Sequence, residues 1–399
     1  GVHEPACWDA ARSNVSLARP ALPAAVFEYL MSDEMYLSAY CCYHGRSQLC
    51  WGDHARLLYD PPQPNYEGVD ELFALCCLPT LRWLLRQPRA PAEAEALLAA
   101  ELAPWRGRAR LVTEEQRASF EVEQNASACR FRVRGGRVHH CRAADGPKFR
   151  KDLWCDRESH ILSTFITALH VLGRLAVLPD VDFFLCCADS PWGCGGDPRA
   201  PLLTQVRLPS APGALRVPHS HVLSIWARRM EFEVPSVDSP WDQKVPRLVF
   251  RGSPGGSRLA FMDQALRGAP RRSVAVDLRA YDWGGRRERI AREVPALGND
   301  SLWGGSLTVA EQLQSRYVLD MDGGGGPSDR LLWVSLSGSV PVVVPSESES
   351  WMGALARPFE HFVPVRGDAS DLAERLAWLR GHDAEARRIA RASRALAPR

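Results

Sequence analysis

An α/β fold, with a doubly wound parallel sheet in the C-terminal part of the chain, is the class that the sequence predicts. Three observations lead to it. After residue 240, short apolar stretches alternate with amphipathic ones, four consecutive glycines follow one apolar stretch, and all twelve cysteines lie before residue 195. The alternation predicts strands and helices in turn, and the glycines predict a close backbone turn at a strand end. The cysteines set the first half of the chain apart from the second.

The composition excludes some classes of protein. The 399 residues are 46% hydrophobic and 24% charged, which suits two or three globular domains. The formal charge of +2 provides no broad basic field, so no nucleic acid is expected as a partner. No apolar run reaches the roughly 18 residues of a membrane span, so none is expected in this segment. The chain begins at Gly1 without a hydrophobic leader, and we expect a trimmed segment.

The cysteines and asparagines bear on the cellular compartment. The twelve cysteines fall between Cys7 and Cys194 and lack the CxxC spacing of a zinc site, which favours disulfides and leaves their pairing open. Three of the four asparagines, Asn14, Asn125 and Asn299, begin N-x-Ser sequons. A glycoprotein in the lumen of the endoplasmic reticulum or Golgi is therefore expected. Buried free thiols with accidental sequons in a cytosolic protein are the alternative.

Three regions follow one another along the chain. Residues 1–105 mix helical patterns such as "PAAVFEYLMSDEMYLSAYCC" with Cys-, Trp- and Pro-rich connections, which predicts a cysteine-rich, mainly helical extension. In residues 106–235 the helix-period stretch "HILSTFITALHVLGRLA" leads into "VDFFLCCAD", a buried strand flanked by Pro179 and Pro191. This pattern indicates a βα-type domain. Residues 236–399 carry the regular alternation.

That alternation predicts a parallel sheet covered on both faces, because its strands are almost entirely apolar and amphipathic helices separate them. In such sheets ligands bind beyond the carboxyl ends of the strands. The predicted strands are 247–250, 272–279, 316–322, 340–346 and 361–365, and the predicted helices are 257–268, 307–314, 328–338 and 369–381.

The glycine run, in "VLDMDGGGGPSDRLLWV", predicts an anion site. Glycines let backbone N–H groups approach an anion without a Cβ in the way, and Ser328 suits the N-cap of the helix that follows. The positive end of that helix favours a phosphate, and Arg330 would add a forked contact. The run is neither a Walker loop nor G-x-G-x-x-G, and a solvent-exposed glycine loop is the alternative.

A second strand, turn and helix of this kind occurs at residues 248–258, "LVFRGSPGGSR". Arg251, Gly252 and Ser253 end the strand, and Arg258 stands where the next helix begins. Two such turns at one edge of a sheet could hold a nucleotide diphosphate from both sides. Arg251 could equally be a structural arginine that binds carboxylates or loop carbonyls.

At these motifs the sequence resembles a known glycosyltransferase family. "FRGS" followed by an arginine, then "YVLDMDGGGGPSDRLLWVSLSGSVPVVV" and "EHFVPV", is similar to the family of fungal capsule-associated proteins and the protein O-glucosyltransferases that modify EGF-like repeats. The resemblance covers about residues 160–395. It implies a GT-B architecture, in which two Rossmann-like domains face a cleft and the C-terminal one binds the UDP-sugar donor.

The resemblance also implies which residues bind the nucleotide. Nucleotide-binding roles fall on Ser253, Arg258, Ser328 and Arg330, with the loop along the phosphates and Arg330 neutralising the departing diphosphate. The full expected nucleotide-binding set is Arg251, Gly252, Ser253, Arg258, Gly324, Gly325, Gly326, Pro327, Ser328, Asp329 and Arg330.

The family's catalytic base is an aspartate that closes a strand of the N-terminal domain, and "LPDVDFFLCCADSP" puts it at Asp189. An inverting transferase needs such a carboxylate to take the acceptor's proton. A turn-capping role before Pro191 is the alternative reading of Asp189. "VPHSHVLSIW" resembles a stretch that lines the cleft, which makes Pro218 and Trp226 candidate substrate contacts; His219 and His221 are alternative bases.

Two further features bear on the resemblance. The protein O-glucosyltransferases have an arginine where this chain has Asp322, whereas other branches have acidic residues there. This favours kinship with the polysaccharide or fungal-like side and leaves the acceptor open. Asp320 and Asp322 also spell the D-x-D of metal-dependent transferases, but Ser328 and Arg330 already offer anion stabilisation nearby. No metal or other cofactor is therefore expected.

The combined expectation is an inverting transferase that moves glucose or xylose from UDP-glucose or UDP-xylose to a hydroxyl of a protein or glycan acceptor. The alternative is a non-catalytic secreted glycan- or protein-binding protein that retains the transferase fold. A nucleotidase or kinase is a third possibility, and it lacks a Walker motif.

Overall fold

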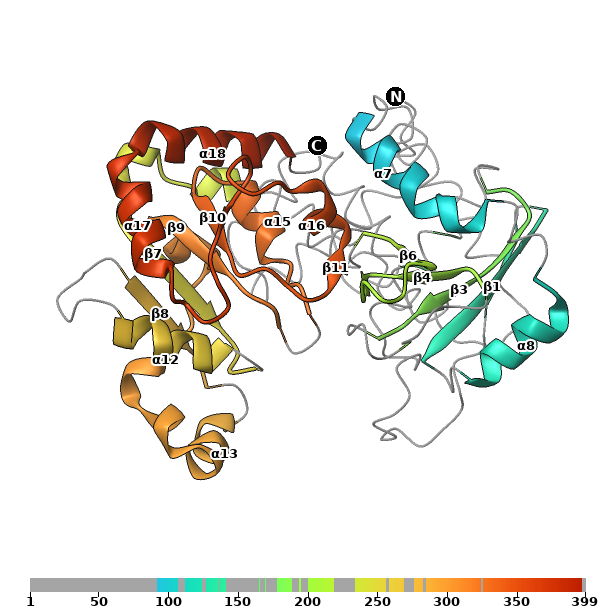
Figure 1. The fold of residues 1–399 in the computed structure, drawn as a ribbon, viewed down its shortest axis with the longest axis horizontal. Coiled ribbons are helices and arrows are strands. Elements are labelled where there is room, and N and C mark those ends of the chain that lie inside the picture. Colours follow the sequence, from blue (N-terminus) through green and yellow to red (C-terminus); the bar gives the residue numbers. More distant parts are fainter. Residues whose placement is uncertain are drawn as a thin grey trace, which may run out of the picture.

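The computed structural model of the chain shows two β-sheets, each accompanied by helices (Figure 1). We call residues 92–218 the N-terminal lobe and residues 234–396 the C-terminal lobe. The structure describes residues 92–106, 112–123, 127–135, 137–140, 165, 169, 178–188, 194, 200–218, 234–255, 258–268, 276–282, 285–323 and 326–396. Most of the expected cysteine-rich extension lies outside these ranges, as does most of the helix expected at residues 160–176, of which Phe165 and Leu169 are described and helical.

The sheet of the N-terminal lobe is mixed, with the order β2-β1-β3-β4-β6. β3, β4 and β6 are parallel, whereas β1 runs antiparallel to both β2 and β3. The Rossmann-like domain expected here would have a parallel sheet, and only the part formed by β3, β4 and β6 fits that expectation. β1 and β2 form a hairpin at Gly135, where φ is 55°, and a hairpin needs no crossover helix. The bounds are β1 Ala128–Arg134, β2 Arg137–His140, β3 Val181–Cys186, β4 Leu202–Thr204 and β6 Ala214–Arg216.

β3 is the buried strand that the run "VDFFLCCAD" predicts, and its last four residues are buried. Phe184 packs edge to face against Phe120 of α8, with ring centroids 4.9 Å apart. Cys186, at the end of β3, forms a disulfide with Cys194 over a Cα separation of 5.9 Å. Every cysteine that the structure describes is disulfide-bonded, which confirms the predicted disulfides in this region. The helices of this lobe are α7 Ala92–Leu102, η3 Ala103–Trp105 and α8 Glu114–Glu123.

A small antiparallel sheet joins the two lobes. β5 Val206–Arg207 pairs with β11 Glu349–Ser350, and α16 Trp351–Leu355, which follows β11, contacts α7. The Nε atom of Arg207 donates to the Glu349 carboxylate at 2.7 Å. The polypeptide after β10 therefore reaches across to the N-terminal lobe and returns (Figure 1).

The sheet of the C-terminal lobe is parallel throughout, with the order β12-β10-β9-β7-β8. Counted along the chain, its strands lie in the spatial order 2-1-3-4-5, a doubly wound arrangement. The chain order reverses between β7 and β9, which are neighbours. This confirms the predicted parallel sheet. The bounds are β7 Val245–Gly252, β8 Val276–Ala280, β9 Ser315–Asp320, β10 Val340–Val343 and β12 Val363–Pro364.

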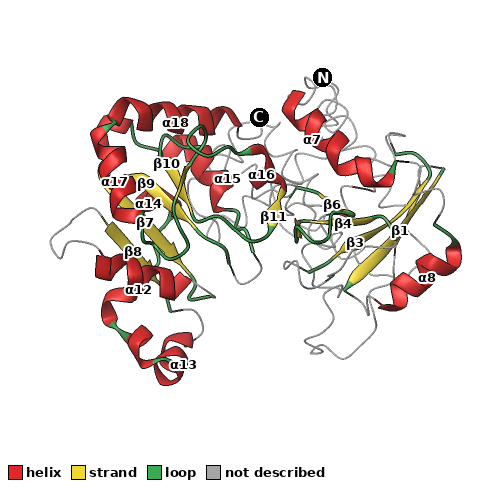
Figure 2. Cartoon of the chain, viewed as in Figure 1, coloured by secondary structure: helices red, strands yellow, loops and turns green. Residues whose placement is uncertain are grey.

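Helices cover both faces of this sheet (Figure 2). Because successive strand residues point to opposite faces, Leu248 and Phe250 join one core cluster and Val249 joins another. The first cluster includes residues of α12, α17 and α18, and the second includes residues of α14 and α15. The bounds of these helices are α12 Arg258–Gly268, α14 Val309–Leu313, α15 Arg330–Ser335, α17 Leu372–Gly381 and α18 Asp383–Leu396.

Some elements of this lobe carry no apolar period in the sequence. α13 Arg286–Glu293 reads "RRERIARE" and has no buried residue, so periodicity could not reveal it. Two short turns follow it and lead to the buried Leu302. The short turns of this lobe are η5 Trp241–Gln243, η6 Pro295–Gly298 and η7 Asp300–Leu302. None of the helices in the described ranges is long and apolar enough to cross a bilayer.

Candidate functional site

The candidate site lies where β7 and β9 end, at the switch point of the C-terminal sheet. The two strands are parallel neighbours, so the turn after Gly252 and the turn after Asp320 meet at one edge of the sheet. In doubly wound sheets this edge is where ligands bind. The structure thus brings together the two turns that the sequence singles out.

Arg258, the first residue of α12, physically joins these turns. Its Nε atom donates to the backbone oxygen of Asp322 at 2.6 Å, and Nη2 donates to that of Met321 at 3.2 Å. Its Nη1 atom donates to the hydroxyl of Ser253 at 3.2 Å and to the backbone oxygen of Ser253 at 3.3 Å. One guanidinium group therefore holds the end of β7 against the end of β9.

Gly252 is needed for this close packing. A Cβ atom built there would lie 2.6 Å from Cζ of Phe250 and 3.3 Å from Nη1 of Arg258. The first distance is shorter than real Cβ contacts. Glycine thus lets the Phe250 ring and the guanidinium of Arg258, 5.5 Å from the ring centroid, pack beneath the turn.

Arg251 is turned away from the second turn. Its Nη2 atom lies 3.0 and 2.9 Å from the two carboxylate oxygens of Asp277 on β8, and Nη1 donates to the backbone oxygens of Phe250 and Asp277. Of the two roles considered for Arg251, this geometry is that of a structural arginine. Its backbone oxygen nevertheless belongs to the site, because it accepts from Arg330.

The glycine run closes into a tight turn. The N–H of Gly323 donates to the backbone oxygen of Gly326 at 2.7 Å, and Gly326 has a φ of 109° that other residues rarely adopt. Pro327 follows and is half-buried. Gly324 and Gly325 lie outside the described residues.

The side chain of Ser328 is held by the buried carboxylate of Asp320. Its hydroxyl donates to Oδ1 of Asp320 at 2.7 Å and accepts from the N–H of Arg330 at 3.2 Å. The helix begins one residue later than expected, because Asp329 and not Ser328 occupies the N-cap of α15, without a side-chain cap bond. Ser328 still satisfies one N–H of the first turn.

The side chain of Arg330 contacts β7 and α14. Its Nη2 atom donates to the backbone oxygen of Arg251 at 2.6 Å, and Nη1 donates to Oε1 of Gln312 at 2.7 Å. The guanidinium lies 4.7 Å from the ring centroid of Phe250 and 5.2 Å from that of Trp333. The fork expected to contact phosphate is thus engaged with protein acceptors in this structure.

The electrostatics of the site are unusual for a protein interior. The described hydrogen-bond acceptors of Arg258 and Arg330 are all uncharged, and nearby carboxylates, that of Asp320 first among them, act on the two guanidinium groups through space. Burial lowers the pKa of Arg330 to about 10, and it also lowers that of Arg258. Since a pKa near 10 is well above neutrality, Arg330 stays positively charged.

Burial raises the pKa values of the acidic residues of the site, whereas it lowers those of the arginines. Burial raises the pKa of Asp320 to about 6, against the opposing effects of the Ser328 hydrogen bond and the nearby arginines. Burial also raises the pKa of Asp322. Oδ2 of Asp322 accepts from the hydroxyl of Ser346 at 2.5 Å, so the two aspartates of the D-x-D turn to different serines. Within the described part of the chain, no three His, Cys, Asp or Glu side chains gather as a metal site would require.

The remaining candidates are not all placed. Asp189 and Trp226 lie outside the described residues, as do His219 and His221. Pro218 follows β6 and is half-buried, in the N-terminal lobe. The sequence reading missed Gln312 and Phe250, which hold Arg330 from α14 and β7. The capping box at the start of α14 is the one signal that Gln312 lies on a helix. Nothing in the sequence pairs Gln312 with Arg330.

Comparison with known proteins bears on the lobe that contains this site. Residues 222–397 match the family model "Glycosyl transferase family 90". The match includes all the strands and helices around the switch point.

Similar curated proteins include two from viruses. An uncharacterized protein, 027R, of frog virus 3 is 29% identical over 232 residues, 51% of this chain and 24% of its own length. Uncharacterized protein 179R of invertebrate iridescent virus 6 is 25% identical over 186 residues, 40% of this chain and 16% of its own. This chain therefore spans about a quarter or less of these relatives. The family match supports a glycosyltransferase family for residues 222–397.

Proposed function

We propose that this protein is an inverting glycosyltransferase that moves glucose or xylose from a UDP-sugar to a hydroxyl of a protein or glycan acceptor. The observation that carries the proposal is the joining of the two switch-point turns by Arg258. This arrangement supports a site that binds one diphosphate between both turns.

The charges at this edge favour a diphosphate. Arg258 and Arg330 bring two positive charges whose described acceptors are neutral, so an anion above the turns would be their first charged partner in direct contact. Cations near a leaving diphosphate stabilise the negative charge that develops as the sugar departs. Arg330 would act through its charge and not by direct contact, and backbone N–H groups of the glycine run would make the direct contacts.

The acceptor's proton needs a base on the other side of the sugar. We assign this role to Asp189, three residues after the end of β3. The acceptor oxygen would attack the anomeric carbon while the bond from that carbon to the diphosphate oxygen breaks. UDP leaves with the bonding electrons, and the acceptor's proton passes to the carboxylate. One such displacement inverts the anomeric centre.

We further propose that the reaction takes place in the lumen of the endoplasmic reticulum or Golgi and needs no metal. The Cys186–Cys194 disulfide supports an oxidising compartment. The two arginines supply positive charge where a Mn²⁺ ion would act in a metal-dependent transferase. Turnover that survives EDTA would support this part of the proposal, and turnover restored only by Mn²⁺ would contradict it.

The direct test measures UDP release from UDP-glucose and UDP-xylose, with and without candidate glycan or peptide acceptors. We expect release that depends on the acceptor and on one of the two sugars. An Asp189→Asn variant should bind UDP as the parent does and lose turnover, because the amide cannot take the proton. Full turnover of this variant would remove Asp189 as the base. UDP-sugar binding without any turnover would instead favour a non-catalytic binding protein.

A further inference from the structure

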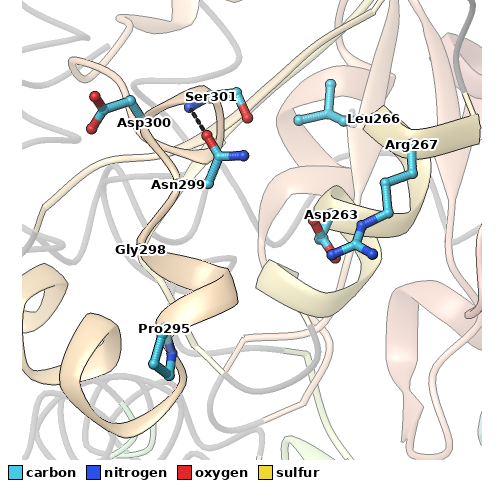
Figure 3. A pocket seen from close by; sticks show the side chains of 8 residues that line it. All are labelled: Asp263, Leu266, Arg267, Pro295, Gly298, Asn299, Asp300 and Ser301. Atoms are coloured by element: carbon cyan, nitrogen blue, oxygen red, sulfur yellow. Dashed lines mark hydrogen bonds and ion pairs between the residues drawn. The ribbon is translucent and has the colours of Figure 1, made fainter.

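A surface groove lies at the end of α12 that is remote from the candidate site (Figure 3). It is open, has a volume of about 950 Å³, and runs between the C-terminal half of α12 and the short turns η6 and η7. α12 spans eleven residues, so its two ends are roughly 15 Å apart at 1.5 Å per residue. The residues that line the groove are Asp263, Leu266, Arg267, Pro295, Gly298, Asn299, Asp300 and Ser301.

Asn299 and Ser301 in this wall are the first and third residues of an N-x-Ser sequon. Both are exposed, whereas the next two residues, Leu302 and Trp303, are buried and anchor the segment. The indole N–H of Trp303 donates to the backbone oxygen of Leu297 at 2.9 Å, which holds the segment from the other side. The sequon thus stands on a well-anchored surface turn, the kind of position where such acceptors are found.

The local hydrogen bonds orient the asparagine amide. Oδ1 of Asn299 accepts from the N–H of Ser301 at 3.0 Å, so the amide nitrogen is left free of that contact. Figure 3 shows the nitrogen on the side that faces α12, toward the groove, while the carboxylate of Asp300 points the other way. Arg287 bonds that carboxylate and offsets the negative charge next to the acceptor.

We propose that Asn299 is an N-glycosylation site and that the first sugars of its glycan lie over this groove. Nδ2 of Asn299 would form a bond to the anomeric carbon of an oligosaccharide carried on a lipid diphosphate. The bond from that carbon to the diphosphate oxygen breaks, the lipid diphosphate leaves with the bonding electrons, and the proton from Nδ2 passes to a base of the host transferase. The glycan sits away from the switch-point edge and leaves it open.

The test produces the full chain behind a secretion leader in mammalian cells and maps its peptides after enzymatic release of N-glycans in heavy-oxygen water. We expect heavy-oxygen labelling at Asn299. Ser301→Ala keeps the hydrogen bond from the backbone N–H to Oδ1 but should abolish the label, whereas Ser301→Thr should retain it. Secreted, folded protein without modification at Asn299 would overturn the proposal, whether or not Asn14 and Asn125 are modified.

A second measurement checks where the sugars lie. Native deglycosylation should increase hydrogen exchange in the C-terminal half of α12 and leave exchange in β9 unchanged. Equal exchange in α12 before and after deglycosylation would show that the glycan does not cover the groove. UDP binding by Ser301→Ala should equal that of the parent, so this inference and the proposed transferase activity fail independently.

Discussion

Two pairs of arginines, one pair in each lobe, differ in the charge of their hydrogen-bond acceptors. In the N-terminal lobe, Arg216 donates to the Glu101 carboxylate through Nε at 2.9 Å, and Arg130 makes a two-pronged contact with Glu114. In the C-terminal lobe, Arg258 and Arg330 donate to described acceptors that are all uncharged. A buried charge that lacks a charged partner is costly to the fold. The proposed function gives a reason for this difference: the first pair would serve stability, and the second pair would serve the diphosphate that we propose.

The largest expected effect is on the paired side of this comparison. Glu101 is 3% exposed and accepts from both Arg207 and Arg216. Glu101→Gln removes the buried carboxylate that both arginines contact and leaves them only the partly exposed Glu349, so it should lower the free energy of unfolding by about 3 kcal/mol. Urea unfolding followed by circular dichroism measures this loss. UDP affinity, measured under folding conditions, should not change. A variant as stable as the parent would mean that this pairing does not support the fold.

The next effect concerns Asp320, a buried acid whose charge interacts with those of Arg258 and Arg330. The folded state raises the pKa of Asp320 from an ordinary 3.8 to about 6, so it holds a proton more tightly than the unfolded chain does. Its contribution to stability is therefore complete below pH 4 and is lost as the pH rises through about 6. Two pKa units correspond to about 3 kcal/mol.

Asp320→Asn isolates that contribution, because the amide keeps an acceptor for Ser328 and does not titrate. The difference in unfolding free energy between the parent and this variant, followed by urea unfolding from pH 4 to 7, should change in favour of the variant as the pH rises. Parallel pH profiles for the two proteins would show that Asp320 does not carry this buried charge.

UDP affinity tests the role of the arginines in the C-terminal lobe. Arg330→Ala removes one positive charge near the glycine turn and should weaken UDP binding by about 1–2 kcal/mol, roughly 5- to 30-fold, as expected for charges that interact through space. Isothermal titration calorimetry measures the change. Arg316→Ala is a matched control, because Arg316 stands at the opposite end of β9 and contacts Asp383. Unchanged affinity in Arg330→Ala, or an equal loss in Arg316→Ala, would remove the special role of Arg330.

The smallest expected effect is between the lobes. Glu349 contacts Arg207 and Arg216 from the C-terminal half of the chain, but its side chain is 37% exposed. Glu349→Gln should lower stability by less than about 1 kcal/mol, since solvent screens such a pair. Melting temperatures of Glu349→Gln and Glu101→Gln compare the two carboxylates directly. A loss as large as that of Glu101→Gln would mean that the lobes depend on this contact.

Much of the C-terminal lobe could be predicted from local patterns. The apolar strands, the amphipathic helices and the two glycine-containing turns are each encoded within a few residues, and parallel strands with helical connections bring strand ends to one edge. That was enough to put Ser253, Arg258 and Ser328 in one region. The hairpin of β1 and β2 and the polar helix α13 escaped prediction, because neither shows the period of a buried helix or of a strand in a parallel sheet.

The sequence by itself determined the parallel sheet and the meeting of its two glycine-containing turns, because the alternation of apolar strands and amphipathic helices is a local pattern repeated along the chain. Only the tertiary structure decided which arginine does what. Arg251, Arg258 and Arg330 are alike in the sequence, yet Arg251 pairs with Asp277 on β8, Arg258 links the turns and Arg330 contacts Gln312. Those partners stand 18 to 79 residues apart in the chain or on other strands. An arginine side chain can reach several acceptors, and the fold decides which of them lie within hydrogen-bond distance.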